Sequence, residues 1–390
     1  MQLKFSPESE LRISKVRRQM FATGAQALLI ADNANLYYLC GAVFRGYIYL
    51  PLEGRPVMFI MRPVGIEGPD VVYIRKPEQI PAELERLGLP KAEVLGLEED
   101  DLSYSDIERL KAAMTPAKMI NASTVMRRAR IVKTDEEIRL IREDGLKQAA
   151  AYKRIPHVYK EEMTDIEFQI EIERQLRLEG CLGYYRTSGR LMEINMGSVL
   201  NGDNADTPTP YDFAVGGGGA DLSLPVGADG RTMKTGTTVM VDMCGNFNGY
   251  QSDMTRVWSI GDIEPQALKA HEVSRRILRT LEKMALPGTP VCELYKAAME
   301  IVEAHGLQSH FMGHLQHAPF IGHGVGIQLN ELPVLTPRSK DILEENMVIA
   351  IEPKFVIPHV GAVGVENTYR VTPTGLECLT PFPEEIPSLL

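Results

Sequence analysis

The sequence predicts an α+β protein of two domains, and three observations support this fold class. The chain has 390 residues, more than one ordinary hydrophobic core organises. Helical and strand patterns alternate up to about residue 120, which is typical of a small α/β domain. Beyond it, two helices followed by strands occur twice, which predicts an α+β domain with internal pseudo-duplication. We place the domains at residues 1–128 and 129–390.

The first domain opens with a clear helix signal. Ser6 is a good N-cap, Pro7 suits the first turn, and Gly24 is a typical stop. Residues 27–30 (ALLI) predict a buried strand, and residues 46–61 predict two strands around a Glu-Gly turn. The basic cluster at 126–130, followed by Lys133, is interpreted as a linker.

The second domain begins with two capping boxes. Thr134 and Thr164 are each followed three residues later by Glu, so each opens a helix, the second ending near Gly180. Two further helices are expected at about 264–285 and 290–305, with strand-rich stretches at 237–260, 345–357 and 361–372. The Gly/Asp/Pro-rich stretch 200–235 predicts a long loop. Its run of four glycines, 216–219, is interpreted as a flexible connection, because no Gly-Lys-Ser/Thr follows to make a phosphate loop.

Composition narrows the classes of partner. The net charge of −10 and the lack of a large basic cluster argue against nucleic acid or an anionic membrane as main partner. The N-terminal ten residues carry acids where a signal peptide would be apolar, and no apolar run is long enough to span a bilayer. The five cysteines are scattered without zinc-like spacing, so we expect a reduced, cytoplasmic setting.

The stretch VDMCGNFNGYQSDMTR (241–256) predicts a β-hairpin with an acid on each arm. Asp242 shares a strand face with Met240 and Cys244, and Asp253 lies on the returning strand. Two surface aspartates near a turn would be the ordinary interpretation of a lone hairpin. The apolar run before Asp242 argues against it, because an acid in such a run is costly unless it is paired or liganded.

Three later segments repeat this anomaly. His323 stands between two glycines, which leaves room for the imidazole to enter a tight site, although a loop histidine is the alternative. Glu352 and Glu366 occur in strongly apolar strand segments. Four carboxylates gathered without cations would repel one another, and two divalent cations would neutralise them. Oxygen ligands with one imidazole suit Mn²⁺, Fe²⁺, Co²⁺ or Zn²⁺.

The motifs VDMCGNFNGYQSDMTR, GHGVG, IEP and GVENT, together with NLYYLCG (35–41) near the N-terminus, resemble one family in order and spacing. This is the metallopeptidase family that includes methionine aminopeptidase, aminopeptidase P, prolidase and creatinase. The resemblance covers nearly the whole chain. It implies a pita-bread catalytic domain behind a creatinase/prolidase-type N-terminal domain.

The resemblance also implies roles for individual residues. Asp242 would bind one metal, His323 and Glu352 the other, and Asp253 and Glu366 both. A metal-bridging hydroxide would attack an amide carbonyl, while Glu352 shuttles the proton. The implied function is that of an Xaa-Pro dipeptidase or aminopeptidase P acting on a short peptide or small amide. The implied assembly is a homodimer.

Two departures from the family pattern affect specificity. Asn330 stands where prolidase-like members have His, and Leu224-Pro225-Val226 stands where they have a Pro-His pair. Asn330 is a candidate hydrogen-bond donor in place of the lost imidazole. Lys354 replaces a common Gly and is a second candidate, although we favour a solvent-facing side chain there. His314 and His317 are interpreted as ordinary loop histidines, with recruitment to the site as the alternative.

Two hypotheses therefore stay open. The complete ligand set favours a two-metal hydrolase, with manganese, cobalt, zinc or iron bound. The missing histidines and the polar loop at 186–230 favour a metal-retaining protein with a non-prolyl, non-peptide (lyase-type) or binding function. We prefer the hydrolase, because a complete set of metal ligands would be hard to keep for binding alone, whereas substrate specificity changes easily.

Overall fold

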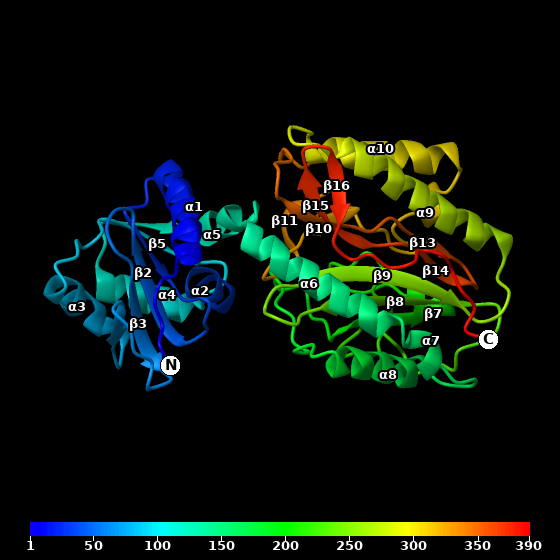
Figure 1. Cartoon of the computed structure of the whole chain (residues 1–390), viewed down its shortest axis with the longest axis horizontal. Coiled ribbons are helices and arrows are strands. Elements are labelled where there is room, and N and C mark those ends of the chain that lie inside the picture. The colour runs from blue at the N-terminus through cyan, green and yellow to red at the C-terminus, as the bar shows by residue number, and fades with distance from the viewer. The chain divides into compact units, whose positions relative to one another are not determined.

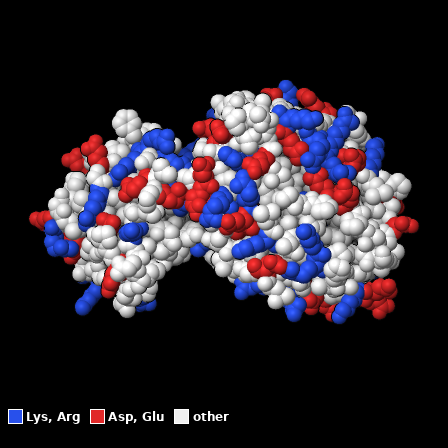
Figure 2. Space-filling view, viewed as in Figure 1, with Lys and Arg blue, Asp and Glu red and all other residues white.

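The structure is a computed structural model that describes residues 1–390. Its contacts divide the chain into two units, Met1–Arg130 and Ile131–Leu390, which are described separately (Figure 1). We propose that these units are the two domains that the sequence predicts. On the face shown in Figure 2, acidic and basic side chains are interspersed on both units. A search for helices apolar enough to cross a bilayer finds none.

The first unit is a mixed six-stranded sheet, in the order β4-β3-β2-β1-β5-β6, with helices around it. The strands are β1 (Ala27–Ile30), β2 (Arg45–Pro51), β3 (Val57–Arg62), β4 (Val71–Tyr73), β5 (Val94–Leu97) and β6 (Lys118–Asn121). The helices are α1 (Pro7–Thr23), α2 (Asn33–Cys40), α3 (Ile80–Arg86), α4 (Tyr104–Met114) and α5 (Ser123–Arg130), with a 3₁₀ turn η1 (Pro77–Gln79). The predicted caps of the first helix are confirmed: Ser6 accepts from the Ser9 amide, and Gly24 ends α1 in a left-handed conformation.

The interpretation of the basic cluster at 126–130 as a linker is wrong. These residues form the C-terminal part of α5, whose Met126 and Ala129 are buried. Arg130 is also buried, and its guanidinium donates to Asn35 Oδ1. Lys133 is buried too, in an ion pair with Glu331 (3.1 Å). The sequence interpretation missed these buried contacts because the partner residues are distant in sequence.

The second unit carries three sheets with the strand orders β7-β8-β9, β11-β10-β12-β15-β16 and β13-β14. Its strands are β7 (Gly197–Asn201), β8 (Thr238–Gly245), β9 (Ser252–Ser259), β10 (Gly322–Gly324), β11 (Glu331–Val334), β12 (Val348–Ile351), β13 (Lys354–Ile357), β14 (Gly361–Gly364), β15 (Asn367–Thr372) and β16 (Gly375–Cys378). Its helices are α6 (Asp135–Tyr152), α7 (Ile155–Val158), α8 (Asp165–Leu178), α9 (Pro265–Met284) and α10 (Val291–Ala304), with 3₁₀ turns η2 (Gly202–Asp206) and η3 (Gln308–His310).

The helices of this unit form two pairs that sandwich the strands (Figure 1). α6 packs on β8 and β9, and α8 packs on β7 and α6. On the other side α9 packs on β13, β14 and β16, and α10 packs on α9. The two predicted capping boxes at Thr134 and Thr164 are confirmed, as are the two later helices. The repeat of a helix pair with its strands matches the predicted pseudo-duplication and leaves the strands facing one another across a shared interior.

The long loop before the hairpin holds more order than its composition suggests. Strand β7 was not predicted, and the run 216–219 packs tightly against the rest of the unit. A side chain at Gly217 would place its Cβ 2.4 Å from Leu200 Cδ2 and 2.6 Å from the Gly227 carbonyl oxygen. The interpretation of this run as a simply flexible connection is therefore incomplete, since close packing also requires its glycines.

Candidate metal centre

The hairpin of β8 and β9 presents both aspartates on one face, as predicted. Cys244 pairs with Asp253 and Asp242 pairs with Thr255. Because residues 242 and 244 share a face of β8, the two carboxylates project the same way. Gly249 closes the turn with φ of +97°, a left-handed conformation that glycine adopts without a steric penalty. The hairpin therefore fixes two acids from opposite arms of one turn.

His323 lies at the centre of the short strand β10 and needs both flanking glycines. A Cβ at Gly322 would lie 2.1 Å from the Ala350 carbonyl oxygen, and one at Gly324 would lie 2.1 Å from that of Leu332. These approaches let β10 pair with β12 on one side and β11 on the other. The imidazole is thus held on a strand rather than in an ordinary loop.

Glu352 and Glu366 lie at breaks between strands, not inside strands as the sequence interpretation had it. Glu352 follows β12 and precedes Pro353, which has no amide hydrogen to continue a ladder. Glu366 lies between β14 and β15, where the Val365 amide donates to Ser274 Oγ on α9 instead of to a strand. Each break turns a carboxylate into the interior.

Three of the predicted ligands converge. Potential ligand atoms of Asp253, His323 and Glu366 all lie within 4.8 Å of one another. Asp253 and Glu366 are buried, and Glu366 Oε1 has no hydrogen-bond partner. His323 Nε2 lies 3.7 Å from Asp253 Oδ2 and 3.6 Å from Glu352 Oε1. A buried carboxylate oxygen without a partner is costly unless a cation completes it.

The two buried acids of this group strongly resist ionisation without a cation. Burial, followed by the charge of Asp242, raises the pKa of Asp253 well above its ordinary value. Burial, followed by the charge of Asp253, does the same for the pKa of Glu366. The three donor groups, two carboxylates and an imidazole, are those that a divalent transition ion prefers. The residues present therefore fit one divalent cation among Asp253, His323 and Glu366.

The expectation that Lys354 faces solvent is wrong. Its side chain is 2% exposed, and its ammonium lies 2.8 Å from Asp242 Oδ2, 2.7 Å from Glu352 Oε2 and 3.1 Å from Glu366 Oε2. Burial alone would lower the pKa of Lys354, but the charges of these carboxylates outweigh it and hold the pKa well above its ordinary value. Asp242 and Glu352 are thereby engaged by a protein cation beside the three-ligand group.

Asn330 lines the cavity and is bonded to the backbone of Ser188. Its Nδ2 donates to the Ser188 carbonyl oxygen (2.7 Å), and its Oδ1 accepts from the Ser188 amide (2.6 Å). Val226, the other position considered for a lost histidine, lines a different hollow from the one that holds the acids. The side chain of Asn330 therefore holds the 186–192 segment in place, with one N–H of its Nδ2 not used by this pair.

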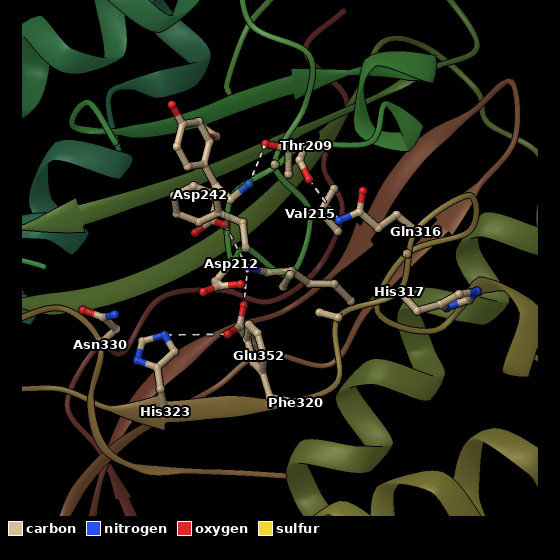
Figure 3. Close-up of a pocket in the computed structure, with 18 of the residues that line it drawn as sticks. Thr209, Asp212, Val215, Asp242, Gln316, His317, Phe320, His323, Asn330 and Glu352 are labelled. Atoms are coloured by element: carbon tan, nitrogen blue, oxygen red, sulfur yellow. Dashed lines mark hydrogen bonds and ion pairs between the residues drawn. The ribbon is translucent and has the colours of Figure 1, made fainter. Parts of the chain in front are cut away.

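The acids, His323 and Lys354 open onto a cavity of about 380 Å³ (Figure 3). Its walls come largely from the predicted loop 200–235 and from the loop before β10, with side chains that the sequence analysis did not name: Thr209, Tyr211, Asp212, Phe213, Gln316 and Phe320. The length of the 200–235 stretch was the signal in the sequence for a functional loop. No local sequence pattern shows which of its residues face the cavity. His314 and His317 also line the cavity, and their Nδ1 atoms contact Asp206 Oδ2 and the Phe311 carbonyl oxygen, both at 2.8 Å.

Cys244 also borders the cavity, and its thiol is not prepared for nucleophilic attack. Burial, followed by the nearby charge of Asp253, raises the pKa of Cys244 well above its ordinary value. A buried thiol that stays protonated is a poor nucleophile. The chemistry of the cavity therefore rests on its carboxylates, imidazole and ammonium.

Comparison with known proteins agrees with this arrangement. Residues 139–373 match the model of metallopeptidase family M24, and residues 12–132 match the creatinase/prolidase N-terminal domain. An Xaa-Pro dipeptidase of Pyrococcus furiosus is 28% identical over 96% of this chain and 99% of its own length. One of Pyrococcus horikoshii is 26% identical over 96% and 98%.

Solved structures agree on the fold. An Xaa-Pro dipeptidase from Bacillus anthracis superposes with a TM-score of 0.79 at 22% identity, covering 97% of this chain and 99% of its own. The prolidase of Pyrococcus horikoshii gives 0.76 at 24% identity, covering 96% and 99%. These likenesses confirm the predicted pita-bread domain behind a creatinase-type N-terminal domain. Since the family model matches well over half of the chain, the protein belongs to metallopeptidase family M24, a metal-dependent family.

Proposed function

We propose that the protein is a metal-dependent hydrolase that cleaves a short peptide or a small amide. The observation that carries the proposal is the convergence of Asp253, His323 and Glu366 on one cavity in a chain of this family. A bound divalent ion supplies a Lewis acid for the amide carbonyl and lowers the pKa of water at the site.

The protein's own groups support hydrolysis at this position. Glu352 faces His323 through Oε1 and is held by Lys354 through Oε2, so one oxygen is fixed and the other faces the site. A carboxylate held in this way suits the acceptance of a proton from water and its delivery to the leaving amine. Lys354 acts as a positioning residue, because its ammonium fixes the carboxylates of Asp242 and Glu352.

The cavity suits a small substrate. A volume of about 380 Å³ lies at the lower end for ligand pockets and has room for a dipeptide rather than a folded chain. Both relatives from Pyrococcus described above are called Xaa-Pro dipeptidases. We therefore propose a dipeptide or another small amide as the substrate class, with Xaa-Pro dipeptides as the first to test.

One observation favours a second candidate, a non-prolyl or non-peptide reaction such as a lyase. Neither position considered for the missing histidines offers an imidazole to the cavity, since Asn330 is bonded to Ser188 and Val226 lies elsewhere. A tetrahedral oxyanion would lack those hydrogen bonds. Hydrolysis of small amides without proline would fit the same geometry.

Several properties implied by the resemblance belong to the same proposal. We expect manganese, cobalt, zinc or iron as the metal and a homodimer in a reducing, cytoplasmic setting. Light scattering of the purified chain tests the oligomeric state, and metal analysis of protein purified without added ions tests the metal.

The deciding experiment is a substrate screen of the full-length protein with added Mn²⁺ or Co²⁺. The panel contains Xaa-Pro dipeptides, matched dipeptides without proline, tripeptides and small non-peptide amides. We expect metal-dependent release of an amino acid from at least one dipeptide class, and its loss in Asp253→Asn together with bound metal. A fully metallated protein that hydrolyses none of them would reject the hydrolase and leave the second candidate.

A further inference from the structure

Lys354 occupies a place in the acid cluster where the resemblance implies a metal ion. Its ammonium contacts the carboxylates of Asp242, Glu352 and Glu366 at 2.8, 2.7 and 3.1 Å. The ammonium donates hydrogen bonds to Asp242 Oδ2 and Glu352 Oε2 and forms an ion pair with Glu366 Oε2. Of these three acids, Asp242 is the one that the resemblance assigns to the first metal alone.

The backbone around Lys354 directs this side chain inward. Lys354 begins β13 and pairs with Gly364 on β14, while its carbonyl oxygen accepts from the Met312 amide. The next residue, Phe355, packs against Phe311 with ring centroids 5.1 Å apart. Because neighbouring residues of a strand point to opposite faces, the side chain of Lys354 points into the site when that of Phe355 packs in the core.

The other end of the cluster is arranged differently. Asp253, His323 and Glu366 bring ligand atoms within 4.8 Å of one another, with two carboxylates and one imidazole as the donor groups. Glu366 uses Oε2 for Lys354 and Thr255, whereas its buried Oε1 has no partner. A cation among these three residues would satisfy that oxygen.

Charge at short range points the same way. A second divalent ion bound by Asp242 would lie beside an ammonium that is only 2.8 Å from that carboxylate. Like charges this close together in a buried site oppose each other strongly. The ammonium therefore occupies the position that a second ion would need.

We infer that Lys354 replaces one of the two metal ions, so that the site holds a single divalent cation bound by Asp253, His323 and Glu366. This inference deepens the proposed function and shares its site. It differs from the expectation of two metal ions that was drawn from the resemblance.

The test is the number of ions per chain. The full-length protein is stripped with chelator, titrated with Mn²⁺ and analysed by elemental analysis and electron paramagnetic resonance. We expect one ion per chain and the spectrum of an isolated Mn²⁺. Two ions per chain, or the spectrum of a coupled pair, would overturn the inference.

A substitution at Lys354 tests whether the ammonium is what excludes the second ion. Lys354→Gly removes the ammonium and should raise the content from one to two Mn²⁺ per chain, while Lys133→Met, which removes a buried lysine paired with Glu331, should leave it at one. A count of one in Lys354→Gly would overturn the inference that the ammonium excludes the second ion. If that variant fails to fold, the wild-type count and spectrum still decide.

The count is also separable from the proposed function. One ion without any peptide hydrolysis would keep this inference and reject the hydrolase. Two ions per chain together with peptide hydrolysis would reject this inference and support the hydrolase.

Discussion

The carboxylate of Glu352 divides its two oxygens between His323 and Lys354. Oε1 lies 3.6 Å from His323 Nε2, and Oε2 lies 2.7 Å from Lys354 Nζ. One oxygen is thus fixed by a charge-assisted hydrogen bond, and the other faces the three-ligand group. A carboxylate held in this way is oriented without being fully occupied, which suits a group that accepts and returns a proton.

Glu352→Gln should separate proton transfer from metal binding. Gln keeps the shape and an oxygen for Lys354 but accepts no proton at neutral pH. We expect kcat to fall by about 10²- to 10⁴-fold. The ion should remain, because Asp253, His323 and Glu366 are unchanged. Steady-state kinetics and elemental analysis of the same preparation measure both, and Glu345→Gln, at an exposed position, is the control. A Glu352→Gln enzyme within a few-fold of the parent kcat would exclude Glu352 as the base.

Asn330→Ala tests whether this side chain serves structure or substrate. The change removes two hydrogen bonds to the Ser188 backbone and should cost roughly 1–3 kcal/mol of stability, or local order in the 186–192 segment. We expect a raised KM with kcat nearly unchanged, because the side chain positions the segment around Ser188 that borders the cavity. Asn195→Ala, at an exposed site in the same stretch, should have little effect. A large fall in kcat at unchanged stability would instead show that Asn330 contacts the substrate.

Gly322→Ala should displace His323. The new methyl would lie 2.1 Å from the Ala350 carbonyl oxygen, so β10 and β12 would have to separate. We expect a loss of about 1–3 kcal/mol in the free energy of unfolding, with weaker metal binding. Urea unfolding and Mn²⁺ titration measure the two effects. Unchanged metal affinity in Gly322→Ala would mean that β10 tolerates the shift.

Much of the fold was predictable because its signals are local. Ser6, Thr134 and Thr164 cap helices through atoms three residues away, and those caps are present in the structure. The hairpin of β8 and β9 follows from its turn residues and the apolar alternation around them. Strand β7 was missed because it lies in a stretch whose composition is typical of a loop.

The site was only partly predictable because its key contacts are not local. The burial of Asp253, His323 and Glu366 follows from apolar neighbours and glycines that the sequence displays. The direction of Lys354 depends on the packing of Phe355 against Phe311, forty-four residues earlier in the chain. The partner of Asn330 is Ser188, and no pattern near either residue reveals the pair. Likewise, no local pattern reveals which residues of the two loops line the cavity.

Asp144 links the hairpin turn to α6 and should make stability depend on pH. Its Oδ2 accepts from the Phe247 amide at 3.0 Å, and burial raises its pKa from 3.8 to about 8. Between these values the folded chain holds a proton that the unfolded chain releases. Stability contributed by this group is therefore present at low pH and lost as pH rises through this window, with a slope of up to about 1.4 kcal/mol per pH unit.

Asp144→Asn removes that titration, so its stability relative to the parent should improve steadily as pH rises from about 5 to about 8. Urea unfolding at several pH values in this range measures the difference between the two proteins. Asp262→Asn, at an exposed position, is the matched control and should follow the parent at every pH. Because the side chains of Asp and Asn differ little in size, a constant offset between parent and Asp144→Asn would reflect hydrogen bonding alone. Such an offset would show that Asp144 is ionised in the folded protein throughout the range.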